Sequence, residues 1–219
     1  MRFHDRTEAG RQLGAAVADL DLLTPLVLAL PRGGVPVAFE IASRLDAPLE
    51  VFVARKVGAP GHREFGIGAI AEGDDPGGVV VDEEALRVLG VSRERFDALA
   101  AEERTELDRR IRHYRGDRRL PKIAGRDVIV VDDGLATGVT AEAALRALRP
   151  RQPHRLLLAV PVCAPDTATR LSSLAEVVCL SQPSDFGAVG RWYERFDQTT
   201  DTEVLDLLAR SATSTTSGR

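Results

Sequence analysis

Short apolar runs, each followed by a polar or glycine-rich loop and then by helically spaced apolar positions, recur along this chain. Runs at 25–30, 48–54 and 128–131 are mostly aliphatic, as in strands buried on both faces of a parallel sheet. Residues 155–160 and 176–180 predict two further core strands. Since helical spacing follows at 35–45 and 141–148, the pattern predicts an α/β fold with a doubly wound, mostly parallel sheet.

Two other segments have helical periodicity. Residues 6–20 predict an amphipathic helix with Thr7 as a candidate N-cap, and 82–114 predict a long helical insertion broken near Gly90, with Ser92 starting the second part. The dense charge of the insertion indicates a solvated face, with a dimerisation or docking arm as the alternative. We expect one domain over 1–210, with the insertion at about 82–115 and a hood at about 183–198, followed by a disordered tail rich in Ser and Thr at 211–219.

The most informative segment is the strand 128–131 with the residues after it. Asp132 and Asp133 come at its carboxyl end and precede a loop of small and hydroxylated residues and a helix. Loop amides at a helix N-terminus can hold a phosphate, and the hydroxyls of Thr137 and Thr140 can donate to it. The two carboxylates would repel a phosphate, so they are better suited to accept hydrogen bonds from a neighbouring pair of hydroxyls. Together these features indicate a site for a ribose 5-phosphate.

A second loop repeats the strand, glycine-rich loop, helix order. Pro31-Arg32-Gly33-Gly34 follows the first strand, and its guanidinium can bind phosphate oxygens through two donors. Arg55 and Lys56 follow the run 48–54. Because ligands of open α/β sheets collect at the carboxyl ends of the strands, these polar groups are expected at one edge. A simple turn and a solvated basic pair are the alternatives.

The strand, acidic pair and hydroxyl-rich loop resemble the phosphoribosyl pyrophosphate (PRPP) motif of type I phosphoribosyltransferases. The resemblance implies catalytic roles for Asp132, Asp133, Arg32 and Lys56, and a cis peptide at Pro31-Arg32. Gly134 stands where the family usually has an aliphatic residue, which is expected to loosen the loop. Ala136 stands where hypoxanthine-guanine enzymes have an aspartate that acts as a base. The implied 5-phosphate ligands are Gly134, Leu135, Ala136, Thr137, Gly138, Val139 and Thr140, and the implied pyrophosphate ligands are Arg32, Gly33, Gly34, Arg55 and Lys56.

Two further segments match positions in that family. The glycine-rich stretch 58–75 corresponds to the mobile loop that closes over the site, and it could bring down His62, Arg63 and Glu64, although 67–71 can also be read as a strand. The hood concentrates aromatic residues in a chain that has few. Phe186, Val189 and Trp192 are candidate acceptor-binding residues, with a hydrophobic plug as the alternative.

Composition narrows the class of protein. The net charge of −4 gives no global basic field for nucleic acid. Cys163 and Cys179 lie in apolar runs and are expected to be reduced, the four His lack metal-ligand spacing, and no signal peptide or membrane span is visible. We therefore expect a cytoplasmic protein that binds neither nucleic acid nor membranes, and the resemblance implies a homodimer.

Three functional hypotheses follow. The leading one is an Mg²⁺-dependent phosphoribosyltransferase that transfers ribose 5-phosphate from PRPP to a nitrogenous acceptor, a base or an amine, and releases pyrophosphate. The alternative is a non-catalytic PRPP-sensing regulatory protein of the same fold, with the insertion as its interaction arm. An unrelated Rossmann-type nucleotide enzyme is disfavoured because no G-x-G-x-x-G links a strand to a helix.

Overall fold

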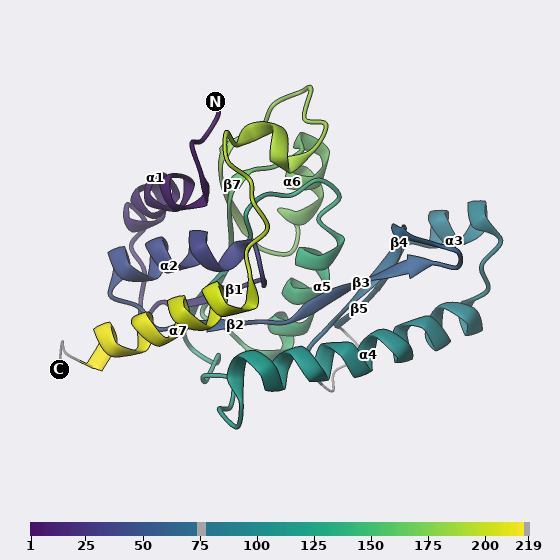
Figure 1. Ribbon diagram of the computed structural model, residues 1–219, viewed down its shortest axis with the longest axis horizontal. Helices are drawn as coiled ribbons and strands as arrows, with labels where there is room; N and C mark the ends of the chain where they lie inside the picture. The colour runs from purple at the N-terminus through teal and green to yellow at the C-terminus, as the bar shows by residue number, and fades with distance from the viewer. Residues whose placement is uncertain (74–77, 217–219) are drawn as a thin grey trace.

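A five-stranded parallel sheet forms the centre of the computed structural model, which describes residues 1–73 and 78–216 (Figure 1). Its strand order is β2-β1-β6-β7-β8. The strands are β1 (Leu26–Ala29), β2 (Leu49–Val51), β6 (Asp127–Val131), β7 (Arg155–Val162) and β8 (Glu176–Ser181). All four pairings are parallel. The chain runs outward from β1 in one direction and from β6 in the other, so the switch point lies between these two strands.

Helices cover both faces of this sheet, as the doubly wound prediction requires. Alternate residues of β1 face opposite cores: Leu26 and Leu28 join one, Val27 and Ala29 the other. The first core is closed by α5 (Val139–Leu148) and α6 (Pro165–Leu171), and the second by α1 (Arg6–Ala18), α2 (Gly34–Leu45) and α7 (Asp201–Thr216).

The segment of the chain that connects β2 to β6 forms an arm that extends from the sheet (Figure 1). It consists of an antiparallel sheet, β3 (Ala54–Ala59), β4 (His62–Ala71) and β5 (Val79–Val81), followed by α3 (Glu83–Leu89) and α4 (Arg93–Arg115). A Cβ at Gly68 would lie 2.6 Å from Cε2 of Phe96, so glycine permits the close approach of α4 to β4. The arm therefore has its own apolar core, which includes Val57, Ile67, Phe96 and Leu107.

The arm corrects two expectations. The run 48–54 is not one strand: β2 ends at Val51, and Arg55 and Lys56 lie within β3 rather than in a loop. Residues 58–71 form most of a β-hairpin with register shifts near Gly58 rather than an irregular loop, and the alternative of a strand at 67–71 is confirmed as part of β4. Asp74 and Asp75, the end of the expected loop, lie outside the described residues. The helical insertion with a break at 90–92 is confirmed, with Gly90 ending α3 and Ser92 capping α4.

The chain ends also differ in detail from expectation. Asp5, not Thr7, caps α1, since its carboxylate accepts the Glu8 amide at 2.9 Å. Helix α7 continues through the buried Ser211 to Thr216, so the tail predicted from 211 is helical as far as the chain is described there. Residues 217–219 lie outside the described part. The hood contains a short 3₁₀ turn, η3 (Val189–Trp192), and both cysteines are free thiols. A second 3₁₀ turn, η2 (Arg149–Arg151), follows α5.

Candidate active site

Two loops meet at the switch point between β1 and β6. The bond between Pro31 and Arg32 is cis, as the resemblance implied. Gly33 lies so close to the second loop that a Cβ there would overlap the Asp133 carboxylate, and a Cβ at Gly34 would lie 2.6 Å from the carbonyl oxygen of Val131. Only glycine allows this approach. The structure thus brings together the two loops that the sequence singled out, although 97 or more residues separate them.

The two carboxylates of the motif each have one oxygen engaged. Asp132 Oδ1 accepts the amide of Asp133 at 2.9 Å, and Asp133 Oδ2 accepts Nε of Arg6 at 2.8 Å. Burial raises the pKa of Asp132 well above its usual value, and the neighbouring charge of Asp133 adds to this. Burial also raises the pKa of Asp133, while the Arg6 guanidinium opposes that rise. Such carboxylates gain from any hydroxyl donors or cation that a ligand supplies.

The loop after Asp133 leads directly into the N-terminus of α5. Gly138 adopts a left-handed conformation, with φ of 66°, and Ala136 and Thr137 are exposed. The first amides of the helix, at Val139 and Thr140, have no carbonyl one turn earlier to bind, so they remain available to an anion. The loop can therefore bind a phosphate group through its backbone.

Helix α6 braces this loop from behind, a feature that the sequence analysis missed. The Thr167 hydroxyl donates to the carbonyl of Ala136 at 2.5 Å. Arg170 donates to the carbonyl of Thr137 and also pairs with Glu142 of α5. Neither residue belongs to a recognisable motif, and only the tertiary packing of α6 brings them to the loop.

Gly134 has a role opposite to the expected one. A Cβ there would lie 2.6 Å from Cγ1 of Val189 and 3.0 Å from Cγ1 of Val162. The missing side chain therefore lets the hood pack against the loop instead of loosening it. The amide of Leu135 fixes the same turn by donating to Val162.

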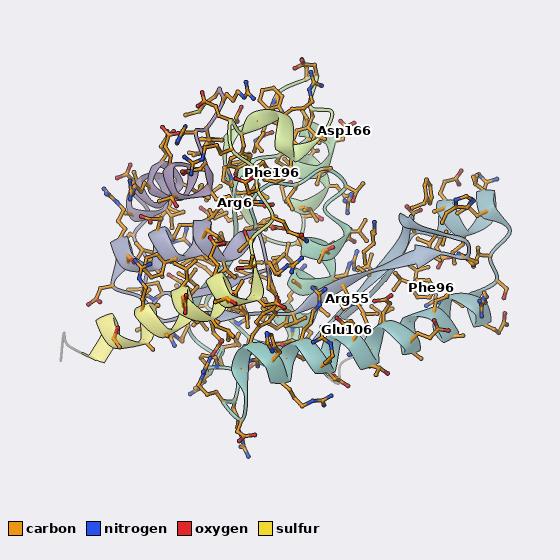
Figure 2. All side chains as sticks on the ribbon, viewed as in Figure 1. Arg6, Arg55, Phe96, Glu106, Asp166 and Phe196 are labelled. Carbon is orange, nitrogen blue, oxygen red and sulfur yellow. The ribbon has the colours of Figure 1, made fainter. Side chains whose placement is uncertain are left out.

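A cavity of about 550 Å³ opens between these loops and the arm. Asp132 and Thr140 reach it from the β6 loop, Pro31 from the β1 loop, and Lys56 from β3. Arg55 lines it as well, but its Nε donates to Glu103 of α4 at 2.6 Å. Figure 2 shows Arg55 facing Glu106, 3.8 Å away. The remaining lining residues are Leu30, Ala54, Val57, Gly58, Ala59, Pro60, Gly61, Arg95, Leu99, Glu102 and Arg110.

Of the predicted basic residues, Arg55 and Lys56 line the cavity, whereas Arg32 is not among its lining residues. Arg32 lies 3.7 Å from Asp201, the first residue of α7, and Tyr114 of α4 donates to the same carboxylate at 2.5 Å. Arg32 is 30% exposed in its side chain, so it remains accessible to a ligand.

Of the candidate acceptor-binding residues, Phe186 is only 6% exposed. It stacks on Trp192, whose indole N–H donates to the Phe186 carbonyl at 2.9 Å. Phe186 packs with Phe3 and Tyr193 in a hydrophobic plug, and Trp192, for which a plug was the alternative, packs against the same cluster. Val189 and Trp192 are half-buried beside this cluster.

Arg6 is a site residue that the sequence analysis did not identify. It enters from α1, and its guanidinium lies 3.9 Å over the Phe196 ring as well as against Asp133 (Figure 2). Its partner in the chain is 127 positions away, so no local pattern could have revealed the contact.

The described residues contain no group of three or more His, Cys, Asp or Glu side chains placed to hold a metal ion. None of the helices within 1–73 and 78–216 has the length and apolar character needed to cross a membrane.

Comparison with known proteins places these features in a family. The phosphoribosyl transferase domain family matches residues 13–191, most of the chain. The chain belongs to this family. Its fold is the type I phosphoribosyltransferase fold, with the small antiparallel sheet of the arm added to the parallel sheet.

Two curated relatives, both from Mycobacterium tuberculosis (strains CDC 1551 and H37Rv), are named "Putative phosphoribosyl transferase" and are 43% identical over 210 residues. The match covers 95% of this chain but 47% of theirs, so the chain spans about half the length of these relatives. A crystal structure of the protein TT1426 from Thermus thermophilus is 45% identical, covers 96% of this chain and 99% of its own, and has a TM-score of 0.77.

Proposed function

We propose that this member of the family transfers ribose 5-phosphate from PRPP to a nitrogenous acceptor and releases pyrophosphate. The observation that supports it most is the meeting of two loops at one switch point. One carries paired carboxylates beside a helix N-terminus, and the other carries a guanidinium and two closely packed glycines. A diol flanked by phosphates at both ends is the ligand that suits this arrangement.

The proposed binding roles follow from charge and geometry. The backbone of Gly134 to Thr140 and the hydroxyls of Thr137 and Thr140 would bind the 5-phosphate. Asp132 and Asp133 would accept hydrogen bonds from the ribose hydroxyls through their unengaged oxygens. Lys56, which lines the cavity, and Arg32 would neutralise the pyrophosphate as it departs, and the backbone of Gly33 and Gly34 would donate to it.

The carboxylate chemistry of the site fits Mg²⁺, which when bound would neutralise pyrophosphate oxygens. Hard oxygen donors suit this ion, and it is commonly held by one or two carboxylates together with substrate phosphates and waters. Asp132 is a carboxylate that lines the cavity at the end of β6, with Asp133 next to it in the chain, so these two would hold the ion.

The reaction breaks the bond between carbon 1 of the ribose and the pyrophosphate oxygen, and it forms a bond from carbon 1 to the acceptor nitrogen. The electron pair of the broken bond leaves with pyrophosphate, and the acceptor loses a proton. Because Ala136 offers no carboxylate, the loop does not supply the base that takes this proton. The residues named above contribute positioning and electrostatic stabilisation of the transition state.

Calorimetric titration with Mg-PRPP, and with ribose 5-phosphate for comparison, is the first test. We expect saturable binding of PRPP that is tighter than that of ribose 5-phosphate, because only PRPP engages both loops. Pyrophosphate release is then measured across a panel of purines, pyrimidines and amines. Release with any acceptor supports the transferase. Tight PRPP binding without release across the panel would favour the PRPP-sensing regulator, and a folded protein that binds neither ligand would overturn both.

The acceptor could be either a base or an amine. The homodimer, the magnesium dependence and the cytoplasmic location expected from the resemblance remain predictions. Binding of the acceptor by Val189 and Trp192 also remains a prediction. Phe186 would have to leave its packed position to contribute more than its main chain.

A further inference from the structure

A clasp joins the start of the chain to the hood beside Asp133. Phe3 donates its amide to the carbonyl of Trp192 at 2.8 Å, and its own carbonyl accepts the amide of Glu194 at 2.8 Å. The Arg195 amide donates to the carbonyl of His4 at 2.9 Å, which extends the pairing by one residue. This backbone pairing sets the position of α1, and so of Arg6, against the hood.

Arg6 uses three sides of its guanidinium within this clasp. Its Nε donates to Asp133 Oδ2 at 2.8 Å, and Nη1 donates to the carbonyl of Asp197 at 2.6 Å. One face lies 3.9 Å over the ring of Phe196, which itself stacks on Tyr193. The side chains of Arg6 and Asp133 are only 12% and 14% exposed. A planar group held by a carboxylate, a carbonyl and an aromatic face has little freedom to rotate.

Tyr193 of the hood holds the main chain of Asp133. Its hydroxyl donates to the carbonyl of Asp133 at 2.6 Å, so both the main chain and the side chain of Asp133 are held. The Gly33 backbone lies against the same carboxylate. Oδ2 of Asp133 is therefore committed to Arg6, which leaves Oδ1 as the oxygen for a ligand hydroxyl.

We propose that Arg6 is a positioning residue of the site. It fixes Asp133 so that a single carboxylate oxygen meets one hydroxyl of a vicinal diol, and it ties that geometry to the hood. Asp132, with its Oδ1 already accepting the Asp133 amide, supplies one oxygen to the second hydroxyl. The diol clamp is thus built from one oxygen of each carboxylate. This inference rests on the proposed function, because it concerns the sugar of the same ligand.

A positioning role for Arg6 distinguishes between ligands in a way that a purely structural role does not. Losing Arg6 should weaken the binding of ligands that contain the ribose and leave pyrophosphate binding unaffected. Its hydrogen bonds go to Asp133 and Asp197 and not to the loop Pro31–Gly34. The variants are Arg6→Gln, which removes the charge, and Arg6→Lys, which keeps it without the planar fork. Arg11→Gln is the matched control, because Arg11 lies on the same helix and pairs with Glu40 at the surface.

The experiment measures calorimetric dissociation constants for Mg-PRPP and for magnesium pyrophosphate, with thermal melts of each variant. For Arg6→Gln we expect PRPP binding to weaken about tenfold or more, with pyrophosphate binding within about twofold of wild type. Arg6→Lys should recover part of the loss, and Arg11→Gln should match wild type. A purine acceptor panel, scored as kcat and KM, should show the loss mainly in the KM for PRPP.

Several results would overturn the inference. Wild-type PRPP affinity in Arg6→Gln would remove any role for Arg6 in sugar binding. Tighter PRPP binding in that variant would mean that Arg6 competes with the sugar for Asp133. Equal losses of PRPP and pyrophosphate affinity, in either Arg6 variant, would indicate a general structural defect. If the wild-type protein binds pyrophosphate but not PRPP, the proposed function itself fails, which is distinguishable from all three.

Discussion

The two ion pairs that flank the candidate site have opposite arrangements. On the core side, Asp133 belongs to the predicted site and its partner Arg6 comes from outside the motif. On the arm side, Arg55 belongs to the predicted site and its partner Glu103 comes from α4. The core pair is 12% and 14% exposed, and the arm pair 20% and 23%. A ligand therefore meets a more rigid carboxylate on one side and a more adjustable cation on the other.

The two ion pairs also differ in how firmly their members are held in place. Arg6 is held by Asp197 and Phe196 in addition to Asp133, so its geometry is overdetermined. Glu103 shares Arg55 with Glu106, which is itself engaged by Arg109 and Arg110. The hydrogen bond from Arg109 lowers the pKa of Glu106 to about 2, so this carboxylate stays ionised at neutral pH. A partly solvated network of this kind can exchange partners at small cost.

The largest effect is expected from Asp133→Asn on the core side. The amide keeps the size of the carboxylate but loses its charge and its strong acceptor, so pyrophosphate release should fall by about a hundredfold or more. The fold should survive, which circular dichroism and a thermal melt can check. A variant that releases pyrophosphate at the wild-type rate would contradict the assignment of Asp133.

Gly33→Ala tests the close approach of the two loops. Its Cβ would overlap the Asp133 carboxylate, so either the Pro31–Gly34 loop or Asp133 must move. We expect PRPP affinity to fall about tenfold, with a destabilisation of about 1–3 kcal/mol. Gly14→Ala in α1 is the control, since its Cβ would make ordinary contacts with the nearest atom at 3.4 Å. Equal binding by the two variants would argue against a shared site.

A smaller effect is expected on the arm side. Glu103→Gln leaves Arg55 with Glu106, so PRPP affinity should change by less than about threefold and stability by less than about 1 kcal/mol. Glu102→Gln, which also lines the cavity, serves as the matched control. If Glu103→Gln altered PRPP affinity as strongly as Arg6→Gln, the contrast between the two sides would be wrong.

A test of a different kind concerns the stability of the ligand-free protein. A carboxyl whose pKa is higher in the folded than in the unfolded chain stabilises the fold below its unfolded pKa, and this contribution is lost as the pH rises through the folded pKa. Burial raises the pKa of Asp132, so its charged form is a cost at neutral pH. Asp132→Asn should therefore raise the melting temperature at pH 7 by about 2–4 °C, as about 1 kcal/mol does in a chain of this size.

The same difference should shrink as the pH is lowered through the raised pKa of Asp132, because the wild-type side chain is then protonated as well. Differential scanning calorimetry at several pH values measures this directly. Asp166→Asn on the exposed side of α6 should change stability by less than about 0.5 kcal/mol at every pH (Figure 2). A lower melting temperature for Asp132→Asn at pH 7 would contradict the cost assigned to its burial.

What the sequence could predict depended on how local the signal was. The strand at 128–131, the acidic pair and the helix after it lie within one short stretch, and the parallel sheet and the loop at Pro31 followed from similar local patterns. The first strand of the hairpin at 58–71 was missed, and the second was only an alternative, because the glycines are typical of a loop; the reason for Gly68, the approach of Phe96, lies far along the chain.

The contacts that support the site were least predictable. Thr167 and Arg170 support the loop after Asp133 from helix α6, which contains no recognisable motif. Arg6 contacts Asp133, which lies 127 positions further along the chain. Ser211 is polar in the sequence but buried on α7, so the expected tail began too early. In each case the side chain owes its position to packing between elements, on which a single sequence carries little information.

The pairing of Leu26 with Val128 has a consequence for how the chain folds. The site exists only after β1 and β6 meet, and the loop between them spans about 100 residues, which makes this a slow, nonlocal step. The arm lies wholly inside that loop and has its own apolar core. Arg115 at its end pairs with Glu72 and donates to the carbonyl of Val51, so an arm that forms first brings its own two ends together and shortens the loop that remains to be closed. The recovery of PRPP binding during refolding should therefore lag behind the burial of Phe96, and the arm should act as a guide for assembly of the site.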